Sequence, residues 1–381
     1  MGFFDFNKKQ QPITPEKPTL ATFSAFDMNC DYTSSFETPY NSGLNGYLYG
    51  PNGLFPQELN KLYNSSALHQ AIINFKKWLT VGNGYEIDRN FLTPDQKTAS
   101  FQLTNFFDKM LEGLALDLYL HNRLAIEVTW NKDNTKILKL KRIPVDKVRI
   151  KDVDHCQEPT RFVYNYDWVF ATKYPKIEYP VFDQLNKNDK VQLYYFQYES
   201  PGMLYYAKPS YVSAINWIYL DAEMAEYHKA NINNSLNPSL WVQYFQDATP
   251  EEKESVKNQW NQTFKGARKT GKVVVTFGKN KDVAPILTQM DPTKLDKTFL
   301  QLTDTIIRQI CYAHETDPML RGLKTPGSLG NSADLPYVYK IFNESVIKPT
   351  QRKLEMILDE FLIINGVPSQ ITLNNNTDLI V

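Results

Sequence analysis

The sequence contains few cysteines, no excess charge of either sign and no long apolar run. Its three cysteines, Cys30, Cys156 and Cys311, are far apart and form no CxxC pair, so neither a disulfide framework nor a cysteine zinc site is expected. Lys and Arg together number 42, as do Asp and Glu, which excludes a protein that binds nucleic acid through a general positive field. The longest apolar stretch, Tyr211–Leu220, is interrupted by polar residues and is well short of the roughly 18 residues of a membrane helix.

The remaining composition is that of a folded protein of two or three domains. Of the 381 residues, 42% are hydrophobic and 13% are aromatic, which excludes a disordered chain. Residues 1–20 are polar, contain several prolines and show no periodicity, so we expect a mobile tail and no signal peptide. Residues 21–60 have no strong helical stripe, and loops with short strands are expected there.

Apolar spacing predicts an α+β region that extends to residue 207. Helical spacing predicts a helix over 68–79, a short strand at 85–87 and a second helix over 94–117. From residue 125 the period changes to two, which predicts an antiparallel hairpin that pairs 125–130 with 137–140. Further strands are expected at 148–151, 162–166, 168–171 and 191–198.

The second half of the chain is predicted to be mostly helical. A long helix is expected from Pro209 to about residue 234, and its second half is much more polar than its first, which is typical of a helix that projects from a packed body. Another long helix is expected over 291–314. A last one, over 333–364, contains Pro349 and should kink there. Between the first two, strands at 240–245 and 272–277 flank a helix that starts at Thr249 and ends near Gly266.

The segment Gly266–Val273 matches the GxxxxGK phosphate-binding loop except at its last position. Val273 replaces the Ser or Thr whose hydroxyl would hold magnesium. A phosphate-binding loop leaves a strand and begins a helix, whereas this segment is predicted to leave a helix and begin a strand. A basic solvated turn is therefore favoured over nucleotide binding.

No group of residues indicates catalysis. His314 lies in HETDP, which lacks the second histidine of the HExxH zinc motif, and His155 beside Cys156 is more typical of a surface loop than of a metal site. We therefore expect no catalytic residue, no metal and no cofactor. Residues 251–281 carry eight Lys and Arg against three acidic residues, which indicates either a solvated face or a surface for an acidic partner or for phosphates.

Six segments, taken in order, resemble motifs of tailed-phage portal proteins. The residues Tyr119–Trp130 and Leu138–Pro144 resemble the family's GNAYxxI…LxxLxP hairpin, although Arg123 lacks the small residue common there. The later segments are YYAKP at 205–209, NSLNPS at 234–239, GARKTGKVVV at 266–275, ICYAHETDPML at 310–320 and KPTQRKLE at 348–355. In the segment ICYAHETDPML, Glu315 stands where glycine is usual in the family.

This resemblance implies an α+β portal fold with a wing, a two-helix stem, a small α/β clip, a tunnel loop and a kinked long helix. The implied regions are the tail (1–20), the wing (21–207), the stem helices (208–236 and 291–314), the clip (237–290), the tunnel loop (315–333), the long wing helix (334–364) and a C-terminal remnant of the crown (365–381).

The resemblance also implies partners and a location. Such proteins form a homo-oligomeric ring, a dodecamer, at one vertex of the capsid, and double-stranded DNA passes through its axis. The implied contacts are the terminase large subunit, the tail adaptor protein and the major capsid protein or scaffold, with no membrane. The protein would be assembled in the host cytoplasm and would reside in the virion.

Two sets of residues are candidates for these contacts. In the tunnel loop, Arg321 and Lys324 are candidates for transient contact with DNA phosphates, and Ser328 with the neighbouring glycines is a candidate for mobility. In the clip, the candidates for terminase or adaptor docking are Arg268, Lys269 and Lys272. The alternatives are another virion structural protein, such as a capsid or adaptor subunit, and a nucleotide-binding enzyme that uses the loop 266–273.

Overall fold

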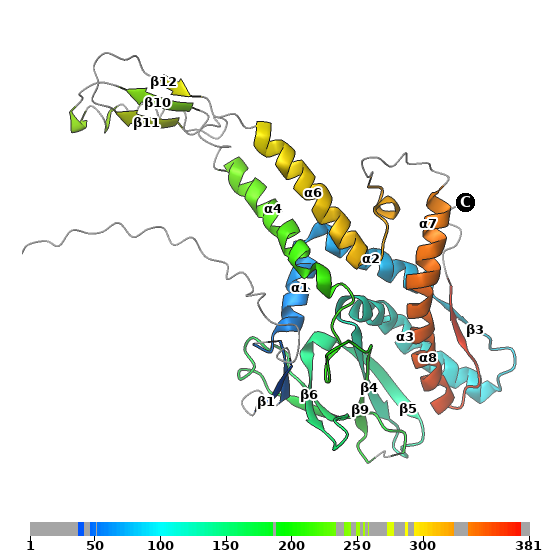
Figure 1. The fold of residues 1–381 in the computed structure, drawn as a ribbon. Coiled ribbons are helices and arrows are strands. Elements are labelled where there is room, and N and C mark those ends of the chain that lie inside the picture. The colour runs from blue at the N-terminus through cyan, green and yellow to red at the C-terminus, as the bar shows by residue number, and fades with distance from the viewer. Residues whose placement is uncertain are drawn as a thin grey trace, which may run out of the picture.

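The structure is a computed structural model of the 381-residue chain. It describes residues 37–41, 46–50, 52–185, 188–233, 240–244, 249–251, 254–255, 258, 273–277, 286–288, 293–323 and 334–374. The tail expected at 1–20 lies outside these residues. The described part contains both helices and sheets, as expected for an α+β fold (Figure 1).

The described part begins with a two-stranded hairpin, which agrees with the short strands expected over 21–60, followed by a helix that the sequence did not predict. Strand β1 (Glu37–Asn41) pairs with β2 (Gly46–Tyr49), and α1 (Phe55–Ser65) follows. The expectation of loops and short strands through residue 60 is therefore wrong from Phe55 onward. Helix α1 has Pro56 in its first turn and buries Leu59 and Leu62, so three turns suffice to give it an apolar face.

The next elements confirm the predicted order of helix, strand and helix. They are α2 (Ala67–Val81), β3 (Tyr85–Ile87) and α3 (Pro94–His121). Helix α3 begins with a capping box in which Thr93 and Gln96 each bond the other's backbone N–H, and it ends where Asn122 takes a left-handed conformation. Phe101, which the apolar stripe includes, is 56% exposed and lies under the Arg89 guanidinium instead of in the core.

Two three-stranded antiparallel sheets follow α3. One contains β4 (Arg123–Trp130) between β5 (Ile137–Ile143) and β9 (Val191–Gln197), which confirms the predicted hairpin. The other contains β7 (Pro159–Tyr164) between β6 (Val148–Val153) and β8 (Ile177–Pro180).

The strand expected at 168–171 is wrong, and β8 was not predicted. The Asn165 side chain accepts the Asp167 N–H, and the Asp167 side chain accepts the Val169 N–H. These local bonds hold successive turns where a strand would need ladder bonds. Trp168 is nevertheless buried, which accounts for the apolar pattern.

The second half contains two long helices joined through a small sheet. Helix α4 (Ile215–Asn233) follows a 3-10 turn at Val212–Ala214, so the expected start at Pro209 is wrong. The Pro209 carbonyl accepts the Val212 N–H in a turn ahead of the helix. Helix α6 (Thr293–Ala313) matches its prediction. Between them, β10 (Leu240–Tyr244) pairs in parallel with β11 (Val273–Phe277) and antiparallel with β12 (Ile286–Thr288), a strand that was not predicted.

The last long helix is interrupted by a π-turn. Helix α7 (Leu335–Phe342) continues through a π-turn at Asn343–Ile347 into α8 (Lys348–Ile364). The expected irregularity near Pro349 thus lies in the turn before it, where the Lys348 N–H bonds the Asn343 carbonyl five residues back. Strand β13 (Ile371–Leu373) then pairs with β3.

Two apolar cores hold these elements together. One joins α1 and α2 to β6, to the start of α4 and to the end of α6. The other joins α3 and α8 to β4, β5 and β13. Helix α3 contributes to both, because Tyr119 and Leu120 face the first core and its earlier turns face the second.

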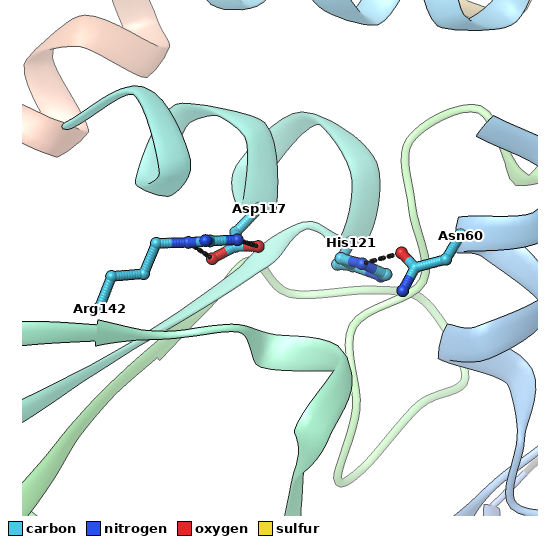
Figure 2. Close-up of polar contacts among 4 residues, drawn as sticks. All are labelled: Asn60, Asp117, His121 and Arg142. Carbon is cyan, nitrogen blue, oxygen red and sulfur yellow. Dashed lines mark hydrogen bonds and ion pairs between the residues drawn. The ribbon is translucent and has the colours of Figure 1, made fainter. Parts of the chain in front are cut away.

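The last turn of α3 carries buried polar side chains that tie the two cores together (Figure 2). Asp117 accepts two hydrogen bonds from Arg142 of β5, at 2.6 and 2.7 Å, and His121 shares a 3.1 Å hydrogen bond with Asn60 of α1. A Cβ at Gly113 would lie 2.5 Å from Arg142 Cδ, so this mid-helix glycine lets the arginine cross α3. Burial raises the pKa of Asp117 to about 6, and the hydrogen bonds from Arg142 oppose that rise.

We expect Arg142→Leu to lower the free energy of unfolding by about 3 kcal/mol at pH 8, because Asp117 would then be a buried unpaired charge. Its pKa would rise above 6, so at pH 5 the carboxyl is protonated in the fold and the loss should be smaller. Urea denaturation at both pH values measures this. Arg161→Leu, which removes an exposed partner 3.9 Å from Glu178, is the control and should change stability by less than about 1 kcal/mol. Equal losses at pH 5 and pH 8 would contradict the account.

Candidate functional site

Helices α4 and α6 lie side by side and project from the two cores, with the β10–β12 sheet beyond their far ends (Figure 1). Among the side chains of the two helices that the structure describes, the buried ones lie near the cores: Ile218 of α4 and Ile306 and Ile310 of α6 are at most 2% exposed. Farther out, Glu223, Glu226 and Leu300 are exposed. The pair is therefore held at its base, and its geometry depends on how that base is fixed.

Two buried histidines meet at this base. His69 Nδ1 of α2 lies 2.9 Å from His314 Nε2, which follows the last turn of α6, so one ring donates a hydrogen bond to the other. The ring of Tyr211, just before α4, packs against both, with centroids 4.6 Å from His69 and 4.8 Å from His314. One cluster thus joins α2 to the base of both projecting helices. The histidines are 245 residues apart, and no spacing in the sequence indicates the contact.

Both histidines are held neutral by their surroundings. Burial, with a smaller contribution from the Lys76 ammonium, lowers the pKa of His69 to about 3. Burial, then the charges of Lys76 and His69, lowers the pKa of His314 well below its ordinary value. A proton on either ring would be a buried charge beside the Lys76 cation.

The segment 205–211, which leads into α4, is anchored by tyrosine hydroxyls. Three phenol hydroxyls donate to main-chain carbonyls that are distant in the sequence. The pairs are Tyr49 with Ala207 (2.5 Å), Tyr206 with Tyr47 (2.8 Å) and Tyr211 with Leu120 (2.8 Å). The segment is therefore attached to β2 and to the end of α3 through backbone acceptors.

Arg123 is fully buried beside these tyrosines. Its guanidinium carbon lies 4.7 Å from the Tyr49 ring centroid and 5.4 Å from that of Tyr206, and it donates to the Tyr195 hydroxyl. Portal proteins commonly have a small residue at the position that Arg123 occupies here. The large arginine side chain thus fills the space between aromatic rings. Sequence reasoning noted the residue and missed this role.

Glu315 directly follows His314 and adopts a left-handed backbone conformation, with φ of 53°. Glycine adopts this conformation at little cost, which gives a physical reason for glycine at the matching position of the resembling family. Glu315 and the buried Lys76 both line a cavity of about 310 Å³ between α2, α3 and the π-turn. Burial lowers the pKa of Lys76 to about 8, and the Glu315 carboxylate partly offsets this.

Arg321 is the only candidate DNA-contact residue that lies within the described part of the chain. It ends a 3-10 turn, Pro318–Arg321, that the Asp317 side chain caps by accepting the Met319 N–H. The guanidinium lies 4.9 Å from the ring centroid of Phe75 in α2. The residue is thus half-buried against the core at the point where the glycine-rich stretch begins.

The other candidate residues lie outside the described part of the chain. These are Lys324 and Ser328 in the expected tunnel loop and Arg268, Lys269 and Lys272 in the expected clip. Of the loop 266–273, the structure describes only Val273, which begins strand β11. A strand at this point agrees with the rejection of a phosphate-binding loop, which would begin a helix there.

One group of described residues has ligand types suited to a metal. The ligand atoms of Asp154, His155 and Cys156 lie within 4.8 Å of one another in the turn between β6 and β7. Asp154 Oδ1 already accepts the N–H groups of Cys156 and Glu158, which explains the turn without a metal. The group is mostly exposed.

We expect the stability of the fold to fall as the pH drops from 7.5 to 5.5. Each buried histidine stays neutral in the fold and takes a proton on unfolding below about pH 6.5, which costs about 1.4 kcal/mol per histidine at pH 5.5. His314→Gln should lower stability at pH 7.5 and reduce the acid-induced loss by about that amount. Thermal unfolding at the two pH values tests this. The control is His155→Gln in an exposed turn, and an equal effect of both variants on the acid-induced loss would contradict the assignment.

Within the described residues, no helix is both long and apolar enough to cross a membrane. The fold itself is similar to solved structures. A chain from the neck of an empty gene transfer agent particle, computed with C6 symmetry, matches with a TM-score of 0.61 at 14% identity over 85% of each chain. The neck of the native particle, computed with C12 symmetry, gives 0.56 at 14% identity, also over 85% of each chain.

A further match, with a TM-score of 0.42 at 11% identity, is an HK97-family phage portal protein from Corynebacterium diphtheriae; it covers 83% of this chain and 94% of that one. The sequence has no significant match among curated proteins. A family model described as phage portal protein matches residues 105–379, which is well over half of the chain. The chain therefore belongs to the phage portal protein family, and it is a structural component of the head-to-tail connection of the virion, not an enzyme.

Proposed function

We propose that this portal protein forms a dodecameric ring at one capsid vertex and that double-stranded DNA passes through the ring during packaging and ejection. The observation that carries the proposal is the pair α4 and α6, fixed at the base and tipped by a small sheet, within a fold that matches a particle neck computed with C12 symmetry. A projecting pair of this kind, repeated around an axis, would form the wall of a channel.

The regions of the chain would then have distinct roles. Residues 21–207 and 334–364 would be the wing, the helices over 208–236 and 291–314 the stem, 237–290 the clip and 315–333 the tunnel loop. Support comes from α4 and α6, which lie side by side, and from α7 and α8, which pack back on the cores. Residues 371–373 pair with β3, and on this division part of the expected crown remnant (365–381) would lie against the wing.

The DNA contacts would be few and weak. A duplex must slide through the channel, so strong phosphate binding would slow it, and zero net charge is compatible with that. We assign transient phosphate contact to Arg321 and Lys324, and loop mobility to Ser328 and its neighbouring glycines. The stacking of Arg321 on Phe75 supports a role at the fixed end of the loop.

The clip would bind the terminase large subunit and the tail adaptor. Arg268, Lys269 and Lys272 are the proposed surface for the terminase large subunit during packaging and for the tail adaptor afterwards. The excess of Lys and Arg over 251–281 supports an acidic partner. The wing would contact the major capsid protein or the scaffold.

Negative-stain images of the purified chain test the central proposal. We expect annuli with twelve-fold symmetry and a central hole wide enough for a duplex. A chain that stays monomeric at every concentration would contradict the ring, and solid or open assemblies would favour a capsid or adaptor subunit. Measurable ATP hydrolysis by the pure protein would favour a nucleotide-binding enzyme instead.

We expect Arg321→Ala and Lys324→Ala to leave rings intact and to change DNA packaging or retention in particles. Each would remove one cation of the proposed tunnel loop. Rings are counted in images, and packaged DNA is measured by nuclease protection. Lys139→Ala, on an exposed position of β5, is the matched control and should change neither. Loss of rings in the first two variants would refute the assignment.

A further inference from the structure

Helices α7 and α8 carry apolar side chains on two opposite sides. One side is buried in the chain's own cores, with Phe342, Leu354, Leu358 and Phe361 at most 3% exposed. The other side, which we call the outer face, consists of Tyr337, Ile341, Met356 and Ile363, which are 68%, 54%, 62% and 66% exposed. Apolar side chains on two opposite sides are typical of a helix that packs between two bodies.

The π-turn helps to align the outer face. Tyr337 and Ile341 are four residues apart, and Met356 and Ile363 are seven apart, so each pair lies on one side of an α-helix. A π-turn inserts one extra residue between the pairs. At about 100° per residue, the four side chains then fall within about 60° of the helix circumference, against about 100° in an uninterrupted helix.

Few charges interrupt the outer face. The exposed positions between the two pairs are Glu344, Ser345, Pro349 and Arg352, so two of them are charged and their charges are opposite. Glu344, seven residues after Tyr337, lies on the face, and its ion pair with Lys348 neutralises its charge. The face extends over about 40 Å, from Tyr337 to Ile363, at 1.5 Å per residue.

We propose that the outer face is covered by the next copy of this chain in the ring; the proposal rests on the ring function above. In a closed ring each copy presents two different surfaces to its two neighbours, so a face of this kind is buried on every copy at once. A near-neutral, elongated apolar face suits a contact between permanent neighbours. The similar fold of a particle neck computed with C12 symmetry supplies the geometry in which such neighbours occur.

Ile341→Glu and Met356→Glu, made separately in the full chain, test the proposal. Each places a charge in the middle of the proposed contact, and we expect the concentration for half-assembly to rise at least 30-fold. Assembly is followed by mass photometry and negative-stain imaging, and folding by circular dichroism and thermal unfolding. Leu138→Glu, on a residue of β5 that is 63% exposed, is the control and should assemble like the unaltered chain.

A mixing experiment separates a lost contact from a lost fold. A variant copy keeps its second surface, so co-expressed in excess with the unaltered chain it should cap open assemblies and prevent their closure. A variant that had failed to fold would leave the unaltered chain to form its rings. Ile363→Ser, a milder change near the helix end, should weaken assembly in the same direction by at least 3-fold.

The outcomes have separate meanings. Rings formed equally well by all variants would overturn the assignment of this face and leave the ring proposal standing. Rings unaffected by an excess of a variant that circular dichroism and thermal unfolding show to be folded would also overturn it. If the unaltered chain formed no rings, the ring proposal and this inference would both fail.

Discussion

The projecting pair depends on a buried polar cluster that has to stay neutral. His69, His314 and Tyr211 meet where α2 contacts the start of α4 and the end of α6, and the only hydrogen bond between the histidines requires one of them to donate and the other to accept. Lys76 lies close enough to lower both histidine pKa values further. The direction of the two long helices thus depends on the protonation state of groups that lie far from their tips.

Much of the fold could be predicted from periodicity. The helices α2, α3 and α6 and the hairpin of β4 with β5 follow directly from their apolar spacing and from local signals such as Thr93 with Gln96 and the glycines at 82 and 84. The failures have local causes. Helix α1 is short and follows a polar segment, which hid its apolar face. The strand expected at 168–171 is instead a series of turns, in which side chains bond the backbone and Trp168 is buried.

The candidate functional site was harder to predict from the sequence than the fold. The family of the chain followed from motif order, and Glu315 stood out because glycine is usual at the matching position; the structure supplies the reason, a positive φ. The histidine contact and the burial of Arg123 could not be found, because each joins residues that only the tertiary fold brings together. The exposed line on α7 and α8 was also hidden, because its four side chains would spread over about 100° of an uninterrupted helix, and the sequence does not show the π-turn that narrows this spread.

The tyrosine hydroxyls along 205–211 bear on how the particle would carry mechanical load. A duplex driven through a channel exerts drag on the wall, and that force would reach the capsid through the segment that leads into α4. The hydroxyls of Tyr49 and Tyr206 attach this segment to β2, and that of Tyr211 attaches it to the end of α3, each through a main-chain carbonyl. The bonds would share the force in parallel, so a thermal opening of any single one would leave the others to bear the tension while it re-forms.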